Sequence, residues 1–135
     1  MSEQPGHEAP KDVVRRFYAE VIDGRDVGAC DRLLTEDFTH DDEPRGRAGQ
    51  RVAVDAFLGG FSDLRTEILL LLAEDDLVAA HLRWTGTHDG PFAGVEATGR
   101  GVAFTSTAVL RVREGMIAAA WDEVDLMGLL GQLRA

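Results

Sequence analysis

The sequence predicts one α+β domain shaped like a cone, in which a strongly curved antiparallel sheet wraps around N-terminal helices and encloses a pocket. Between Val13 and Phe57 the apolar residues recur at helical spacing, whereas after Ser62 long segments alternate apolar and polar side chains. Helices followed by hairpin-connected strands are typical of an α+β fold. A chain of 135 residues forms one domain by ordinary size, with enough core to leave room for a pocket.

Three helices are expected ahead of the sheet. The first begins at Pro10, where the missing N–H of proline costs nothing, and ends at Gly24. The other two are expected at about residues 27–34 and 47–59. A polar stretch with two prolines, residues 1–10, is expected to be a disordered tail ahead of the single domain at 11–135.

The strands follow from alternation and from turn residues. A strand and turn are expected at residues 37–44, and a short apolar helix at 126–133 closes the chain. Four long strands in hairpin succession lie between them, and their expected ranges are 64–73, 77–88, 102–113 and 116–124.

Charge limits the class of partner. The formal net charge is −10, which disfavours nucleic acid and anionic membranes because both are bound through Lys and Arg. A hydrophobic small molecule is the expected ligand. The polar start of the chain carries no apolar signal segment, and a cytoplasmic protein is therefore expected.

Asp122 is the strongest candidate for chemistry. Alternation places it on one strand face with Ala118, Ala120 and Val124. A carboxylate among small apolar neighbours loses solvation, which raises its pKa and suits it to act as an acid or base near neutral pH. The alternative is an aspartate exposed at the strand end or used in a structural hydrogen bond.

Several motifs together resemble the SnoaL-like polyketide cyclases, over roughly residues 11 to 134. They are Asp37-Phe-Thr-His40-Asp, Gly46-Arg47, Phe61-Ser-Asp-Leu-Arg65, Trp84-Thr-Gly-Thr-His88-Asp-Gly90, Phe92, Gly94, Thr98-Gly99, Glu114-Gly-Met-Ile117, Trp121-Asp122 and Asp125 to Leu133. The resemblance implies the nuclear-transport-factor-2-like cone. It also implies ring closure by intramolecular aldol condensation without a cofactor, with Asp122 as the base.

The chain departs from that family beside the base. Where the family's cyclases have a histidine on the preceding strand, this chain has Ala108. A glutamine two residues earlier corresponds to Ser106, and an asparagine in the first strand corresponds to His40.

Two histidines are candidate catalytic donors beside Asp122. His40 is expected to form hydrogen bonds in the pocket, and His88 lies on the same strand face as Trp84. His88 could point toward the pocket mouth or anchor the following loop to backbone. His40 and Asp42 share a face at i, i+2, but no second histidine lies at close spacing, so no metal site is expected.

The pocket wall is expected to be aromatic. The candidate substrate-binding residues are Phe38, Phe57, Phe61, Trp84, Phe92 and Phe104, with Ser106 and Ala108 on the same inner face. The alternative is that these side chains are simply core. The apolar residues of the last helix must also be buried, over the sheet or against another copy, which favours a homodimer or higher homo-oligomer.

Three functions follow from these observations. The leading one is an enzyme, a cofactor-free cyclase. A second is ketosteroid isomerase-like or epoxide-opening chemistry, with Asp41 or Asp42 as the base. The expected oxyanion-binding tyrosine then falls at Phe17, with Tyr18 one step off the pocket face. A third is a non-catalytic module that binds small molecules or partners.

Overall fold

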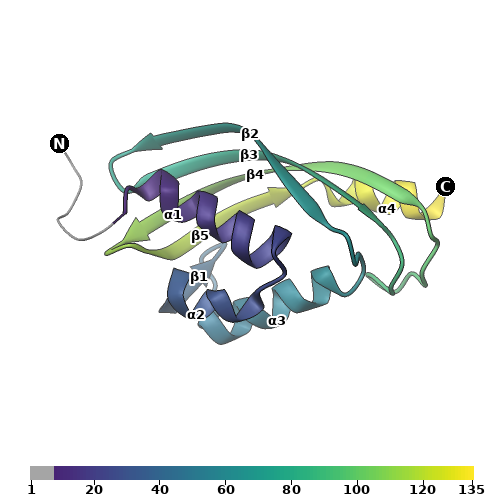
Figure 1. The fold of residues 1–135 in the computed structure, drawn as a ribbon, viewed down its shortest axis with the longest axis horizontal. Helices are drawn as coiled ribbons and strands as arrows, with labels where there is room; N and C mark the ends of the chain where they lie inside the picture. The colour runs from purple at the N-terminus through teal and green to yellow at the C-terminus, as the bar shows by residue number, and fades with distance from the viewer. Residues whose placement is uncertain (1–7) are drawn as a thin grey trace.

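A curved five-stranded sheet covers the helices in the computed structural model, which describes residues 8–135 (Figure 1). The strands are β1 (Leu34–His40), β2 (Arg65–Glu74), β3 (Leu77–Thr87), β4 (Gly101–Arg113) and β5 (Met116–Val124). Their order across the sheet is β1-β5-β4-β3-β2, and the sheet does not close on itself. The cone-like α+β architecture expected from the sequence is confirmed.

The N-terminal helices lie on the concave side of this sheet, and the C-terminal helix lies at its far end (Figure 1). The helical segments are α1 (Pro10–Arg16), the π-helical η1 (Phe17–Asp23), the 3₁₀ turn η2 (Val27–Ala29), α2 (Cys30–Leu33), α3 (Gly46–Leu58) and α4 (Leu126–Arg134). The first helix starts at Pro10, as expected. The expected tail at residues 1–10 falls mostly outside the described residues.

The second half of the first helix is wider than an α-helix. The N–H of Gly24 donates to the carbonyl of Ala19 at 2.8 Å, a bond to the fifth residue back. A side chain at Gly24 would place its Cβ 2.8 Å from the Glu20 carbonyl oxygen, so glycine suits the end of this segment. Phe17 and Tyr18 are both buried here.

Strand β1 differs from the expected segment in position and direction. It begins at Leu34, in place of the expected last turn of the second helix, and ends at His40. It runs parallel to β5, with His40 opposite Ala120, so the sheet is not entirely antiparallel. Burial explains the earlier start of the strand, because Leu34 and Phe38 are each 1% exposed and need the inner face of the sheet.

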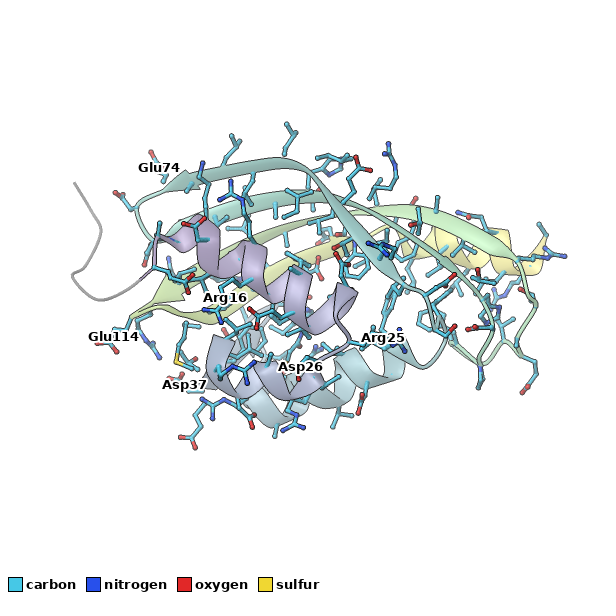
Figure 2. The ribbon with its side chains drawn as sticks, viewed as in Figure 1. Arg16, Arg25, Asp26, Asp37, Glu74 and Glu114 are labelled. Atoms are coloured by element: carbon cyan, nitrogen blue, oxygen red, sulfur yellow. The ribbon has the colours of Figure 1, made fainter. Side chains whose placement is uncertain are left out.

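The four long strands form the expected hairpins, and their alternation sets the inner face. On β4 the buried residues are Val102, Phe104, Ser106, Ala108, Leu110 and Val112. The turns between strands contain Asp75 and Glu114 at positive φ (56° and 53°). In Figure 2 the labelled side chains of Glu74 and Glu114 point outward at these hairpin ends.

Two polar anchors hold the helices in place around the sheet. Arg25, labelled in Figure 2, donates to the carbonyl of Phe61 at 2.8 Å and to that of Leu58 at 2.9 Å, which ties the end of η1 to the end of α3. Arg47 donates through Nε and Nη2 to the Leu34 carbonyl, both at 3.0 Å, which fixes α3 against β1. These hydrogen bonds fix the helices against one another and against β1.

Helix α4 packs at the open end of the sheet. The carboxylate of Asp125 accepts from the N–H of Gly128 at 3.0 Å and caps the helix. Leu129 and Leu133 are buried, whereas Met127 is 88% exposed. Within residues 8–135, no helix has both the length and the apolar character needed to cross a membrane.

Candidate active site

A cavity of about 450 Å³ lies between the helices and the concave face of the sheet. Apolar side chains from η1, α3 and all strands but β2 form most of its wall, and polar groups gather at one end. Of the sequence-predicted residues, Phe38, His40, Phe57, Trp84, Phe92, Ala108 and Asp122 line it. Phe61, His88, Phe104 and Ser106 are not among the lining residues.

Asp122 reaches this cavity from β5. Its Oδ1 atom is buried without a hydrogen-bond partner among the described residues, and its side chain is 27% exposed. Burial raises the pKa of this carboxyl from 3.8 to about 6, and the negative charges of Asp41 and Glu123 add to the effect. A carboxyl with this pKa exchanges protons near neutral pH, as a general acid–base catalyst requires.

His40 lies beside Asp122 at the polar end. Its Nε2 atom is 4.0 Å from Asp122 Oδ2, and its Nδ1 atom is 3.3 Å from Asp41 Oδ2. Burial lowers the pKa of the imidazole, and the charge of Arg45 lowers it further. A neutral imidazole is expected at pH 7, and the 4.0 Å separation is too long for a direct hydrogen bond to Asp122.

Ala108 is the Cα partner of Asp122 on the neighbouring strand β4. It is 2% exposed, and its methyl group lines the cavity. The position at which the resemblance implies a histidine therefore faces the carboxylate directly. With only a methyl group there, Asp122 has an apolar neighbour in place of a polar partner.

Asp41 and Asp42 follow β1 but do not line the cavity. Asp41 Oδ1 accepts from the backbone N–H of Asp122 at 2.9 Å, and Asp42 Oδ1 accepts from Trp121 Nε1 at 3.0 Å. Both carboxylates thus hold the end of β5. An isomerase base at either residue would lie outside the cavity.

The predicted aromatic residues divide between the cavity wall and the core behind it. The ring of Phe57 lies 5.0 Å from that of Phe92 and 5.7 Å from that of Trp84, and all three line the cavity. Phe61 and Phe104 pack behind them, at 6.0 Å and 5.9 Å from Phe57, and are 0% and 4% exposed. Some of the predicted aromatic residues therefore form the pocket wall, and the others are core.

Ser106 supports the wall from behind. Its Oγ accepts a hydrogen bond from Trp84 Nε1 at 2.8 Å, and the serine is 3% exposed. The bond satisfies the buried indole N–H and orients Trp84, whose ring stacks on Phe104 with an interplanar angle of 11°. This hydroxyl is therefore occupied in the core and is not placed to contact a ligand.

His88 anchors the loop that follows β3, which is the second of the two orientations that the sequence allows. The side chain is fully buried beside Phe61, with ring centroids 5.6 Å apart. Its Nδ1 atom accepts from the N–H of Thr98 at 3.2 Å, and its backbone N–H donates to the carbonyl of Arg100 at 2.8 Å. His88 does not line the cavity, so its candidate role as a catalytic donor is corrected: these bonds turn the ring toward the 89–100 loop.

Sequence reasoning missed three polar lining residues, Tyr18, Arg45 and Gln50. Helical spacing predicts Tyr18 one step off the pocket face, but the π-helical turn brings both Phe17 and Tyr18 to the cavity. The signal was present, since Tyr18 lies four residues after Val14 and four before Ile22. Burial, together with the charge of Asp122, raises the pKa of the Tyr18 hydroxyl. Arg45 and Gln50 had no sequence signal beyond their proximity to His40.

No cluster of three or more His, Cys, Asp or Glu side chains suited to hold a metal ion occurs within residues 8–135. The i, i+2 spacing of His40 and Asp42 makes them the nearest candidates for such a site. Asp42 instead accepts a hydrogen bond from Trp121 Nε1, on the side of β5 away from the cavity. His40, Arg45 and Asp122 at the polar end of the cavity offer hydrogen-bonding and acid–base groups.

Comparison with known proteins adds a family and several structures. A family model described as SnoaL-like polyketide cyclase matches residues 12–133. The comparison with curated proteins finds no match.

Among solved structures, a proposed SnoaL-like polyketide cyclase from Jannaschia sp. CCS1 is similar in fold. Its TM-score is 0.86 at 21% identity, over 100% of this chain and 98% of that one. IdmH from Streptomyces antibioticus, a proposed polyketide cyclase, has a TM-score of 0.84 at 26% identity, over 95% of this chain and 100% of that one. AclR from Streptomyces galilaeus, a proposed hydroxylase, has a TM-score of 0.83 at 27% identity, over 93% and 95% of the two chains.

Proposed function

The chain belongs to the SnoaL-like polyketide cyclase family, and from this premise we propose that it closes a ring in a hydrophobic polyketide-like molecule by acid–base catalysis without a cofactor. One observation carries the proposal: the Asp122 carboxylate opens into a largely apolar cavity, with one oxygen buried and unpartnered among residues 8–135. A buried acceptor with no protein donor is available to a proton of the ligand.

The proposed reaction is an intramolecular aldol addition, the ring-closing step of an aldol condensation. Asp122 removes a proton from a carbon flanked by carbonyl groups, the C–H bond breaks, and the electron pair moves onto a carbonyl oxygen as an enolate. The enolate carbon then attacks a second carbonyl carbon of the same molecule, so that a C–C bond forms and the second oxygen becomes an alkoxide. The protonated Asp122 returns its proton to that alkoxide, and all atoms of the substrate remain in the product.

The environment of Asp122 suits both steps. With a pKa of about 6, the carboxyl is mostly ionised at pH 7 and can take a proton, yet its acid form is strong enough to give the proton back. His40 lies 4.0 Å from Asp122 Oδ2. Its neutral imidazole supplies a hydrogen-bond donor or acceptor for a ligand oxygen at the same end of the cavity.

The cavity suits a ligand with an aromatic or other flat apolar body. Its volume of about 450 Å³ falls within the range of small-molecule sites. Phe57, Trp84 and Phe92 line the wall away from the charged groups and offer ring faces for stacking.

Proton abstraction can be tested without knowledge of the natural substrate. The probe is ethyl 2-methyl-3-(2-naphthyl)-3-oxopropanoate, which joins an aromatic body to a C–H between two carbonyl groups. We expect the protein in D₂O to accelerate loss of the C2–H signal in proton NMR, and Asp122→Asn to bind the probe but exchange it at the buffer rate. Glu123→Gln, the exposed neighbour on β5, is the matched control and should retain the acceleration. Exchange by Asp122→Asn at the wild-type rate would show that another group is the base.

A non-catalytic binding module is the second candidate, and Ala108 is the observation that favours it. The residue opposite Asp122 carries no proton donor, and His40 is too far for a direct hydrogen bond. Such a module would bind the probe without accelerating exchange, and Asp122→Asn would bind it equally well or more tightly. Isomerase-like chemistry keeps one favourable feature, Tyr18 in the cavity wall, but its expected bases lie outside the cavity.

We propose further that two copies pair through the outer face of the sheet. Leu72, Ala79, Val109 and Trp121 form one continuous row across β2, β3, β4 and β5. Leu72 is 65% exposed and Val109 is 37% exposed, so the row offers apolar surface to a partner. Sedimentation velocity should give a dimer for the native chain and a monomer for Leu72→Glu. Val52→Glu, a 70% exposed position on α3, should leave the dimer intact.

A further inference from the structure

Arg45 brings a positive charge to the polar end of the cavity, where it lines the wall together with His40 and Asp122. Its Nη1 atom donates to Gln50 Oε1 at 2.7 Å. Throughout residues 8–135, no carboxylate lies within 4.0 Å of its guanidinium. A guanidinium has five N–H donors and Gln50 takes one, so donors remain for an oxygen of the ligand.

The side chain of Arg45 is held in this position by the first turn of α3. Its stem passes over Gly49, where an added Cβ would lie only 2.7 Å from Arg45 Cγ and 3.8 Å from Cδ. Any larger residue at position 49 would displace the arginine, because Cγ is too close to the backbone to move away freely. Packing against Gly49 and the hydrogen bond to Gln50 thus direct the guanidinium toward the cavity.

The charge of Arg45 reaches both neighbouring groups. It lowers the pKa of His40 and that of Asp122, although burial outweighs it at Asp122. In the resting state, the polar end therefore contains one cation and one ionised carboxylate. A second permanent anion there would be repelled by Asp122.

Proton abstraction changes this balance in one direction. When Asp122 takes a proton it becomes neutral, and the negative charge appears on the carbonyl oxygen of the ligand. An oxyanion close to Arg45 restores the pair of opposite charges within a cavity where water screens them weakly. Arg45 thus stabilises a negative charge that exists only after the proton has moved to Asp122.

We propose that Arg45 binds the oxygen of the reacting carbonyl and stabilises the enolate formed when Asp122 removes the α-proton. The substrate is then an enolisable carbonyl compound whose apolar body lies among the aromatic residues and whose reacting carbonyl lies between Asp122 and Arg45. The inference rests on the proposed role of Asp122, but binding of an oxyanion can be measured separately from catalysis.

The test uses 6-cyano-2-naphthol, an aromatic compound whose ionised form differs in absorption from its neutral form. It is bound to Asp122→Asn, in which the amide stands for the protonated carboxyl. We expect the pKa of the bound naphthol to fall by about one unit or more below that of the free compound, a tenfold preference for the oxyanion. The shift should disappear in Asp122→Asn/Arg45→Met. The control adds Arg51→Met to Asp122→Asn instead, and the shift should persist in it. Arg51 is an exposed arginine on α3, paired with Asp31 at 3.4 Å.

Gly49→Ala provides a second variant that keeps the charge of Arg45 but moves it. Added to Asp122→Asn, it should remove most of the naphthol shift, whereas Gly131→Ala, which has open space around its Cβ, should not. The proposal would be overturned if the pKa of the naphthol bound to Asp122→Asn did not shift, or if the pKa shifted equally with and without Arg45. Failure of the naphthol to bind would also contradict it, because the cavity is proposed to hold an aromatic body with its oxygen at Arg45.

The exchange assay separates this inference from the proposed function. Arg45→Met should bind the naphthyl keto ester yet exchange its C2–H about 100-fold more slowly than the native chain, in line with the loss of one oxyanion donor. If Asp122→Asn retains exchange while Arg45 still shifts the naphthol pKa, the base is wrongly assigned and the oxyanion site stands. If Arg45→Met exchanges at the native rate, the oxyanion role fails and Asp122 can still be the base.

Discussion

The carboxylate of Asp41 accepts a hydrogen bond from the backbone N–H of Asp122 at 2.9 Å. This bond joins the end of β1 to β5 and places a second negative charge beside Asp122 without exposing Asp41 to the cavity. Burial contributes most to the raised pKa of Asp122, and the charge of Asp41 contributes next. The same contact therefore holds the strand end and tunes the acidity of the candidate base.

The pH dependence of proton exchange should report this arrangement. Asp122 acts as a base only when ionised, so the exchange rate should rise with pH and reach half its maximum near pH 6. Asp41→Asn should lower that midpoint, because the amide oxygen still accepts the backbone hydrogen bond while the negative charge is lost. Rates measured between pH 4 and 9 provide the check.

Asp42→Asn is the control for this series. Its carboxylate accepts from Trp121 Nε1 and is not among the causes of the Asp122 shift, so the midpoint should stay in place. A loss of exchange on substitution of Asp41 or Asp42, with the activity of Asp122→Asn unchanged, would instead support an isomerase-like base on the first strand.

Replacing Asp122 by asparagine should stabilise the fold at high pH. The folded-state pKa of about 6 lies above the ordinary 3.8, so folding favours the protonated carboxyl. This group's contribution is most favourable below pH 4 and is lost as pH rises through 6. Asp122→Asn should therefore gain roughly 1 to 3 kcal/mol over the native chain at pH 8, as a shift of this size implies. Urea denaturation at pH 8 and pH 4 tests this, and an equal difference at both values would exclude ionisation as the cause.

Restoring a histidine at position 108 should speed the reaction. Ala108 is the Cα partner of Asp122 and lines the cavity, so an imidazole there would stand beside the carboxylate and could donate to the alkoxide. The exchange probe forms no alkoxide, so the test uses ethyl 2-(2-naphthoyl)-6-oxoheptanoate, which keeps the naphthyl body and the C–H between two carbonyl groups and can close a five-membered ring. Ala108→His should raise the rate of this ring closure about tenfold or more, at the low end of what a positioned general acid supplies.

Val109→His serves as the comparison, because Val109 lies on the outer face and is 37% exposed. It should leave turnover unchanged. Equal rates for Ala108→His and the native chain, with both folded and binding the probe, would mean that proton return does not need a group at position 108.

Ser106→Ala should destabilise the core through Trp84. The change leaves the buried indole N–H without its acceptor, which costs about 1 to 3 kcal/mol. In a Trp84→Phe background the donor is absent, and the same serine change should cost much less. Urea denaturation of the four proteins gives the coupling between the two residues, and purely additive effects would contradict a role for this bond.

The location of Asp122 on the inner face could be predicted from local pattern. Alternation at the end of the strand places Asp122 with Ala120 and Val124, and all three line the cavity, because successive side chains of a strand point to opposite faces. A bulge between Ile117 and Ala119 breaks the alternation further back, so Ile117 lines the cavity in place of the expected Ala118. The same rule places Ala108 on the inner face of its strand. Turn residues between the long strands likewise determine the hairpins locally.

Other features depended on contacts between distant segments. Tyr18 reaches the cavity because a π-helical turn, not the expected α-helical one, ends at Gly24. His88 could face a pocket or a loop on alternation alone, and only the Thr98 backbone N–H, ten residues away, decides between them. Ser106 shares the inner face with Ala108 but is used by Trp84.

The sequence by itself determined the fold class and the inward position of Asp122, since periodicity, turn chemistry and strand alternation act over a few residues, and its motifs carried the resemblance to the family. Only the tertiary structure decided the acidity of Asp122, the position of Arg45 in the cavity wall and the loop-anchoring role of His88. Desolvation, charge–charge interaction and hydrogen bonding depend on which side chains lie within a few ångströms, and that is settled when β1, β5 and α3 pack together.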